Sequence, residues 1–285
     1  MEPEETHMHP PRRIASWVTF VLALLASGAV LLIIPRPLPA APAITWTPSS
    51  VSQTAVAGAS KSLSVSFTSS ANVNNIAVWV VPELQPYLRV TPSSFSSIRA
   101  GLSYTLTITI APAATTTPGT VDGTIHLRSA DNPPKTFAKP LSVTLSVIWP
   151  SVTLSDVGLV VNYPASFTPT ISQGSSESGV GFYRDLQAYS QGIPPIFNMT
   201  VAVLPQGLTL RQWIQSFGVK DADIISIATG NWTYLRWFES IGDGMGVTTA
   251  STLIDATHII NFTSPDATLF SDSQFLMMLG SFTAP

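Results

Sequence analysis

The chain has 285 residues, a formal net charge of −3 and no cysteine, and only 10% of its residues are charged. The absence of cysteine excludes disulfides, thiolate metal sites and a cysteine nucleophile. The slightly acidic balance argues against a nucleic-acid-binding surface, so we expect no nucleic-acid partner. A mean hydropathy of +0.31 with 45% apolar residues excludes a chain that its charge keeps disordered. The length allows two modest domains.

The first predicted element is a transmembrane helix at residues 14–34, preceded by a short cytoplasmic tail at 1–13. No charged residue interrupts the apolar segment, and its length matches the ~20 residues that cross a hydrocarbon core. Arg12 and Arg13 stand immediately before it and Trp17 lies near its start, positions that suit a membrane interface. We therefore expect a single-pass protein of the cell membrane, with the bilayer as a partner and both C-terminal domains periplasmic or extracellular.

A cleaved signal peptide is the alternative interpretation of this segment. Residues 41–43, Ala-Pro-Ala, offer small side chains in an A-x-A pattern. The apolar segment is longer than the ~7–15 residues of a signal-peptide core, and Pro42 is poorly placed for a peptidase. The pattern therefore favours a retained signal-anchor. Residues 35–43 are rich in proline and alanine, which predicts a stiff, extended linker.

Residues 44–149 contain short segments in which polar and apolar residues alternate. The alternation is clearest at 62–67, 105–110, 123–128 and 141–147. A period of two predicts strands with one face in a core and the other in water. Turn residues separate these segments, and about seven strands in this length are typical of an all-β sandwich.

This part of the chain resembles the bacterial immunoglobulin-like domains of exported proteins. The resemblance lies in Trp46-Thr-Pro-Ser-Ser, Val90-Thr-Pro-Ser-Ser-Phe95 and the segments 100–108 and 118–125. These motifs specify a fold and no activity. The resemblance implies a spacer or docking domain, in which we expect Trp79 to be a core residue.

A second domain is expected at 150–285, where Pro150 marks the boundary and the charge turns from basic to acidic. Most of it has the pattern of short strands. Residues 208–217 change to a helical period, and Thr209 with Gln212 forms a capping-box pattern at its start. A closing helix is expected within 268–282. We therefore predict an α+β domain with an antiparallel sheet covered by helices.

The second domain resembles the PsbP-like domain superfamily. The residues that carry the resemblance are Asn162-Tyr163-Pro164, Leu210-Arg-Gln-Trp213-Ile and the segment 276–282, and it covers 152–284. The resemblance implies a largely non-enzymatic, extracytoplasmic accessory protein. No catalytic residue carries over from it.

The densest aromatic run lies at 231–238. Alternation along a strand places Trp232, Tyr234 and Phe238 on one face and Trp237 on the other. An exposed aromatic face would stack on a sugar ring or a partner, so these three residues are the candidate ligand-binding set. The alternative is that they pack beneath the helix that contains Trp213.

No motif for catalysis, a metal or a cofactor stands out. The four histidines, at 7, 9, 126 and 258, show no metal-binding spacing. Asp221-Ala-Asp223 is more typical of a solvated turn than of a cation site, and Asp255 with His258 more typical of a turn than of a catalytic pair. We therefore expect a protein that is not an enzyme.

The sequence thus predicts a membrane-anchored envelope protein. Its immunoglobulin-like domain would act as a spacer or docking surface and would present the distal domain to an envelope or surface protein. The alternative is a carbohydrate- or small-ligand-binding module that uses the aromatic side chains of the distal domain.

Overall fold

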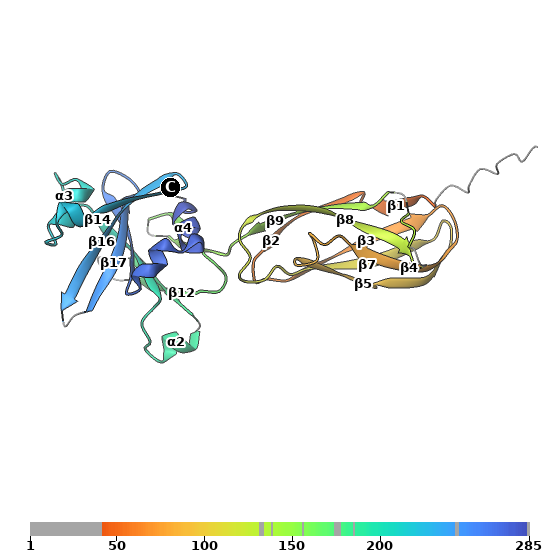
Figure 1. Ribbon diagram of the computed structural model, residues 1–285, viewed down its shortest axis with the longest axis horizontal. Helices are drawn as coiled ribbons and strands as arrows, with labels where there is room; N and C mark the ends of the chain where they lie inside the picture. The colour runs from red at the N-terminus through yellow and green to blue at the C-terminus, as the bar shows by residue number, and fades with distance from the viewer. Residues whose placement is uncertain are drawn as a thin grey trace, which may run out of the picture. The chain divides into compact units, whose positions relative to one another are not determined.

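The computed structural model describes residues 42–130, 134–137, 139–155, 157–173, 178–184, 186–242 and 245–283. Strands make up most of these ranges (Figure 1). The first part is a sandwich of two sheets. One sheet has the order β1 (Ile44–Thr47), β3 (Lys61–Ser69), β7 (Ser103–Ile110), β5 (Leu88–Thr91). The other has the order β2 (Ser50–Val56), β9 (Leu141–Ile148), β8 (Gly119–Ser129), β4 (Val73–Val80), β6 (Ser94–Ile98).

The core of the sandwich lies between these two sheets. Every second residue of β9 is buried, as its alternating sequence predicted. Phe67 is 1% exposed, and its ring lies 5.1 Å from that of Trp46 and 5.7 Å from that of Tyr104, measured between centroids. All strand pairs in the sandwich are antiparallel except β2 with β9. The predicted immunoglobulin-like β-sandwich is therefore confirmed.

Trp79 is not a core residue, contrary to expectation. It lies on the outer face of β4, because Val78 and Val80 turn toward the core and the alternation leaves Trp79 outside. The guanidinium carbon of Arg128 lies 3.5 Å from the centroid of the indole ring. The ring of His126 is 5.3 Å away, and the pKa of this histidine is lowered by burial and by the charge of Arg128.

The distal domain is built on a seven-stranded antiparallel sheet. Its order is β12 (Thr168–Gln173), β13 (Ser178–Tyr183), β14 (Phe197–Val203), β18 (His258–Ser264), β17 (Met245–Leu253), β16 (Trp232–Gly242), β15 (Ile225–Thr229). A separate pair is formed by β10 (Ser151–Leu154) and β11 (Leu159–Asn162). The helical elements are α2 (Leu186–Ser190), α3 (Leu210–Gln215), η1 (Asp221–Asp223), η2 (Ala267–Ser271) and α4 (Ser273–Gly280).

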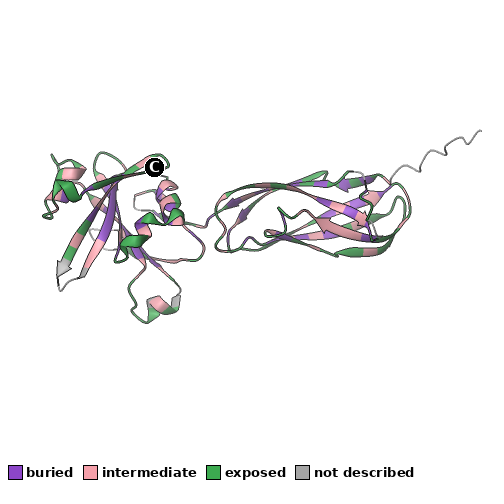
Figure 2. Ribbon diagram, in the orientation of Figure 1, coloured by how far each residue is buried: buried purple, intermediate pink, exposed green. Residues whose placement is uncertain are grey.

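One face of this sheet packs against η2, α4 and the residues that follow α4. Phe275, Met278 and Leu279 of α4 are buried in the same core as Phe197 and Phe262 of the sheet. Figure 2 shows buried residues along the central strands. α3 lies on the opposite face, where Ile214 packs with Trp237 in a smaller cluster. The two faces of the sheet therefore have different partners.

The expected fold class needs correction. The distal domain is mainly β, because most of its Thr-, Val- and Ile-rich segments pair into one sheet. Its helices are short, and α4 with eight residues is the longest helix in the described ranges.

No helix in those ranges is long and apolar enough to cross a membrane. The segment expected to do so, 14–34, lies outside the described residues together with Arg12, Arg13 and Trp17. The fold class is a β-sandwich followed by a mainly β domain. The location of the domains outside the cytoplasm stays a prediction.

Candidate functional site

The three aromatic residues proposed to bind a ligand lie on one face of β16, but they differ in exposure. Tyr234 is 0% exposed, and its hydroxyl donates a hydrogen bond to the carbonyl oxygen of Leu279. Burial raises the pKa of this tyrosine far above its ordinary value. Trp232 is half-buried and stacks on Phe282, with ring centroids 4.0 Å apart. Phe238 is 58% exposed.

Trp232 and Tyr234 therefore pack against α4 and the residues after it, not beneath the helix that contains Trp213. The indole N–H of Trp232 donates to the carbonyl oxygen of Phe282 at 3.3 Å, so its polar atom already has a partner. Of the three, Phe238 presents a largely open ring at the surface.

A second aromatic group lies on the other face of β16, and we call it the aromatic corner: Trp213, Phe217 and Trp237. The ring of Phe217 lies 4.9 Å from that of Trp213 and 5.6 Å from that of Trp237, between centroids. Trp237 is 5% exposed, whereas Phe217 is 48% exposed. The sequence pattern placed Trp237 on this face but could not indicate that α3 would cover it.

The position of α3 is held by its N-terminal cap and by a salt bridge to η1. The predicted capping box is present, because the Thr209 side chain accepts from the Gln212 backbone and the Gln212 side chain accepts from the Thr209 backbone. Arg211 forms a salt bridge of 2.6 Å with Asp221 of η1. The carboxylate of Asp221 is therefore engaged with α3 and is not arranged with Asp223 as a cation site.

Polar side chains continue from the aromatic corner across the same face of the sheet. The indole N–H of Trp237 donates to Ser251 Oγ at 3.1 Å, and Ser251 Oγ donates to Asn261 Oδ1 at 2.7 Å. In the neighbouring row, Thr249 and Thr263 hydroxyls lie 3.1 Å apart. These polar groups form their hydrogen bonds with one another, so both rows of side chains stabilise the sheet.

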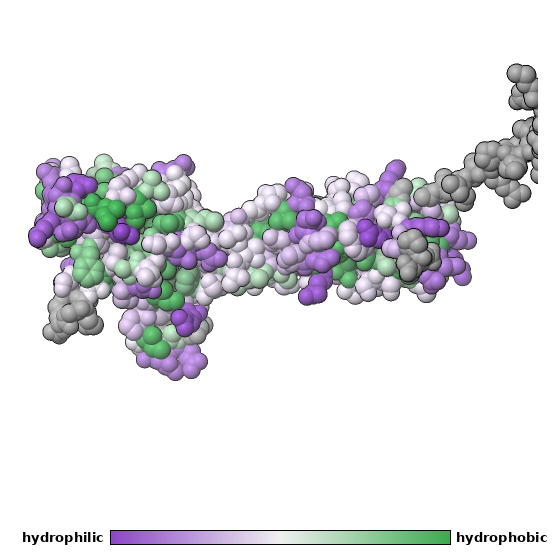
Figure 3. Space-filling model, viewed as in Figure 1, coloured by the Kyte–Doolittle hydropathy of each residue, from purple (hydrophilic) through white to green (hydrophobic). Residues whose placement is uncertain are grey.

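β15 forms one edge of the sheet and is largely exposed. β15 stands at the end of the strand order and pairs with β16. Ile225, Ser226 and Ala228 are exposed. Figure 3 shows hydrophobic residues gathered on the distal domain beside α3. This edge was not recognised from the sequence, because a strand pattern does not indicate which strand ends a sheet.

Asp255 and His258 do meet, but within a turn. Asp255 Oδ1 accepts from the backbone N–H groups of Thr257 and His258, and Oδ2 lies 2.8 Å from His258 Nδ1. These contacts, the Thr257 backbone first, hold the pKa of Asp255 below its ordinary value. Within the described ranges no group of three histidine, cysteine, aspartate or glutamate side chains is placed to hold a metal ion.

No family model matches the chain, and no curated protein matches it. Among solved structures, it is similar to the ASH / PapD-like domain of human CEP192, with 12% identity over 41% of this chain and 93% of that one, and a TM-score of 0.27. It is also similar to the periplasmic chaperone SfaE, with 11% identity over 58% of this chain and 95% of that one, and a TM-score of 0.28. A third similar structure is the E. coli chaperone DraB, with 10% identity over 73% of this chain and 90% of that one, and a TM-score of 0.29. The assignment of the immunoglobulin-like fold rests on the strand order and the core of the sandwich. These comparisons give no support to the PsbP-like resemblance of the distal domain.

Proposed function

We propose that this protein is a non-catalytic binding protein whose distal domain receives an extended segment of a partner protein along β15. The sandwich then serves as a spacer or second docking domain. The observation that carries the proposal is that β15 ends its sheet with an uncharged and largely exposed strand. An unpaired strand edge is a template on which another strand adds.

The two edges of the same sheet differ in how they are protected. Natural sheets discourage edge pairing with proline, charged residues, bulges or a covering element. The opposite edge strand, β12, carries Pro169 within it. β15 has the sequence Ile-Ser-Ile-Ala-Thr, with neither a proline nor a charge. The β15 edge is therefore the one open to an added strand.

The backbone of β15 is oriented for such an addition. β15 and β16 are joined by a two-residue loop after Thr229, and Gly230 adopts a φ of +56° there. In an antiparallel pair, hydrogen-bonded and non-hydrogen-bonded pairs alternate. Because a two-residue hairpin closes on a hydrogen-bonded pair, Ser226 and Ala228 direct their backbone N–H and C=O groups away from β16.

One exposed apolar side chain lies on β15 itself. Ile225 is 48% exposed and pairs with Arg236. Phe217 of the aromatic corner lies on the other face. Side chains of an added strand alternate between the faces. The partner segment is therefore expected to be extended and uncharged, with apolar side chains.

The test is site-specific photo-cross-linking in cells of the source organism. A benzophenone amino acid at position 228 is expected to give a discrete cross-linked product, whereas the same group at position 172 on β12 is expected to give none. Ser226→Pro should abolish the product, because it removes an outward N–H without removing a bond to β16. Ser226→Thr keeps that N–H and should retain the product.

Three results would overturn the proposal: no product at position 228, equal products at 228 and 172, or a product that Ser226→Pro leaves unchanged. Mass spectrometry of the product identifies the partner segment. A product formed between two copies of this chain through another surface would also contradict the proposal. Circular dichroism of Ser226→Pro and Ser226→Thr checks that both variants fold.

A further inference from the structure

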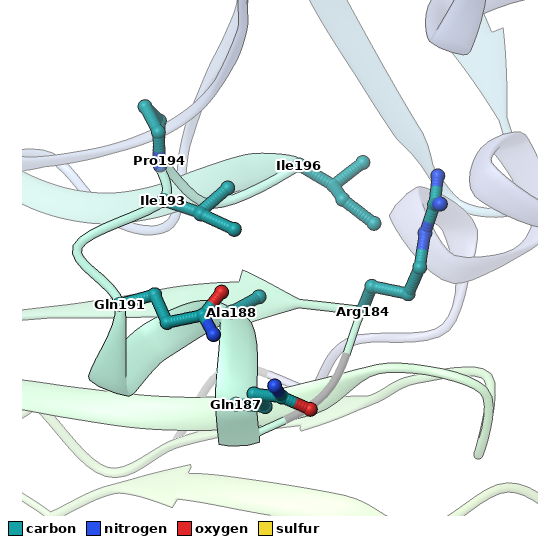
Figure 4. Close-up of a pocket in the computed structure, with 7 residues that line it drawn as sticks. All are labelled: Arg184, Gln187, Ala188, Gln191, Ile193, Pro194 and Ile196. Carbon is teal, nitrogen blue, oxygen red and sulfur yellow. The ribbon is translucent and has the colours of Figure 1, made fainter.

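A hollow of about 420 Å³ opens where the chain passes from β13 through α2 to β14 (Figure 4). Its volume lies within the ~300–1,000 Å³ of ordinary small-molecule sites. In the close-up, Ile193, Pro194 and Ile196 lie along one side, and Gln187 of α2 and Gln191, which follows α2, lie along the other. Arg184 stands at one end of the hollow.

The apolar side of the hollow is held in place by backbone hydrogen bonds. The N–H of Ile196 donates to the carbonyl oxygen of Phe182 at 2.8 Å. The carbonyl oxygen of Ile196 accepts from Ser264 Oγ at 2.8 Å. The next residue, Phe197, is fully buried. Ile196 is therefore fixed to the sheet, and the hollow is preformed on this side.

The α2 side of the hollow is positioned by a tight turn. Gly192 has a φ of +70°, a conformation that favours glycine. The N–H of Ile193 after this turn donates to the carbonyl oxygen of Ala188 at 3.0 Å. Gln187 and Gln191 are one helical turn apart, so their carboxamides share a face. This arrangement brings the amide groups opposite the isoleucines.

The side chains of the hollow define the chemistry of its ligand. Arg184 is exposed, and it belongs to neither of the salt bridges found among the described residues. None of the described lining residues is acidic. Ile193 is 49% exposed, so part of its aliphatic surface is open to solvent in the hollow. A guanidinium favours a carboxylate, which it binds through paired N–H groups.

We propose that this hollow binds a carboxylate attached to a short aliphatic chain. The carboxylate contacts Arg184, and the aliphatic chain lies against Ile193 and Ile196. Two sources supply this chemistry: a free aliphatic carboxylic acid, and the C-terminal carboxylate of a peptide that ends in an apolar residue. The site is separate from the β15 edge and does not depend on the function proposed above.

Isothermal titration calorimetry on the full chain tests the proposal with matched probes. The free acid is represented by octanoate, with octanol as its uncharged control. The peptide terminus is represented by acetyl-Ala-Val-Leu with a free carboxylate, with its C-terminal amide as control. We expect one of the two carboxylates to bind and its uncharged control to bind at least about tenfold more weakly, because a charge-assisted hydrogen bond is lost.

Two variants connect the binding to this hollow. Arg184→Gln keeps a polar side chain but removes its charge, and it should weaken the binding of the carboxylate by about tenfold or more. Arg89→Gln changes an exposed arginine of the sandwich and should leave the affinity unchanged. Ile193→Ser should reduce the advantage of octanoate over butyrate.

The outcomes separate the sources and leave the proposal open to refutation. Binding of octanoate alone assigns a free acid, and binding of the peptide acid alone assigns a chain terminus. Binding of both supports the shared chemistry. Failure of both probes overturns the proposal, as does an affinity that Arg184→Gln does not change while its near-ultraviolet circular dichroism matches that of the parent protein.

Discussion

The ring of Phe217, just beyond α3, lies nearly parallel to the ring of Trp237 on β16, with centroids 5.6 Å apart and an interplanar angle of 12°. This stack joins a half-exposed side chain to a buried one. It is one of the contacts through which the α3 segment covers one face of the sheet. Because one ring is open to solvent and the other is not, the two residues should contribute unequally to stability.

We therefore expect Trp237→Ala to lower the free energy of unfolding by about 3–5 kcal/mol, the range for a buried aromatic side chain. It also removes the indole N–H that Ser251 accepts. Phe217→Ala should lower it by about 1 kcal/mol, because much of that ring already contacts water. Urea denaturation measures both losses, and equal losses would contradict the assigned burial.

The hydroxyl of Tyr234 should matter more than its small size suggests. Tyr234→Phe leaves the carbonyl oxygen of Leu279 without its buried donor, which costs about 1–3 kcal/mol. Tyr104→Phe is the matched control, since the Tyr104 hydroxyl accepts a bond from the Arg99 backbone at an exposed position. Tyr104→Phe should lower the free energy of unfolding by no more than about 1 kcal/mol. Chemical denaturation that ranks Tyr104→Phe as the more damaging change would refute this prediction.

Two glycines of β8 should respond oppositely to alanine. A Cβ at Gly123 would lie 2.6 Å from Cγ of Leu84, which is fully buried. The crowding in Gly123→Ala should lower the free energy of unfolding by about 1–3 kcal/mol. A Cβ at Gly119 meets no atom within 4 Å, so Gly119→Ala should be neutral or stabilise by up to about 1 kcal/mol. Thermal denaturation of the two variants gives a direct comparison.

The Asp255 turn predicts a dependence of stability on pH. The Thr257 backbone and then the His258 side chain lower the pKa of Asp255 in the folded state. As the pH falls, the carboxylate of Asp255 therefore takes up a proton at a higher pH in the unfolded chain than in the folded chain. The stabilisation that this carboxylate gives above about pH 4 is lost progressively below that pH. Asp255→Asn should reduce the melting temperature at pH 7, and the difference from the parent protein should shrink toward pH 2. A difference that stays constant across this range would exclude the assigned role.

Local features of the fold could be predicted because their causes are local. The alternation in 62–67 and 141–147 predicted β3 and β9, since a strand turns successive side chains to opposite faces. Thr209 and Gln212 predicted the start of α3, because a capping box needs residues only three positions apart. The sandwich followed from many such strands in sequence.

The assignment of faces could not be predicted in the same way. Alternation correctly placed Trp232 and Tyr234 opposite Trp237 on β16, but it does not say which face meets which helix. The same holds for Trp79, because alternation along β4 does not say which face of the strand meets the core. A large aromatic residue suits either a core or a cation above its ring, and only the packing of distant segments decides between them.

The sequence by itself determined which segments are strands, where α3 begins and how side chains alternate, because these depend on residues a few positions apart. Only the tertiary structure decided that β14 lies beside β18, that β15 is left at an edge and that Arg184 and Ile196 line one hollow. Strand order is set by pairing between segments far apart in the chain. A free edge or a hollow exists only once that pairing is complete, so neither has a signature in a local pattern.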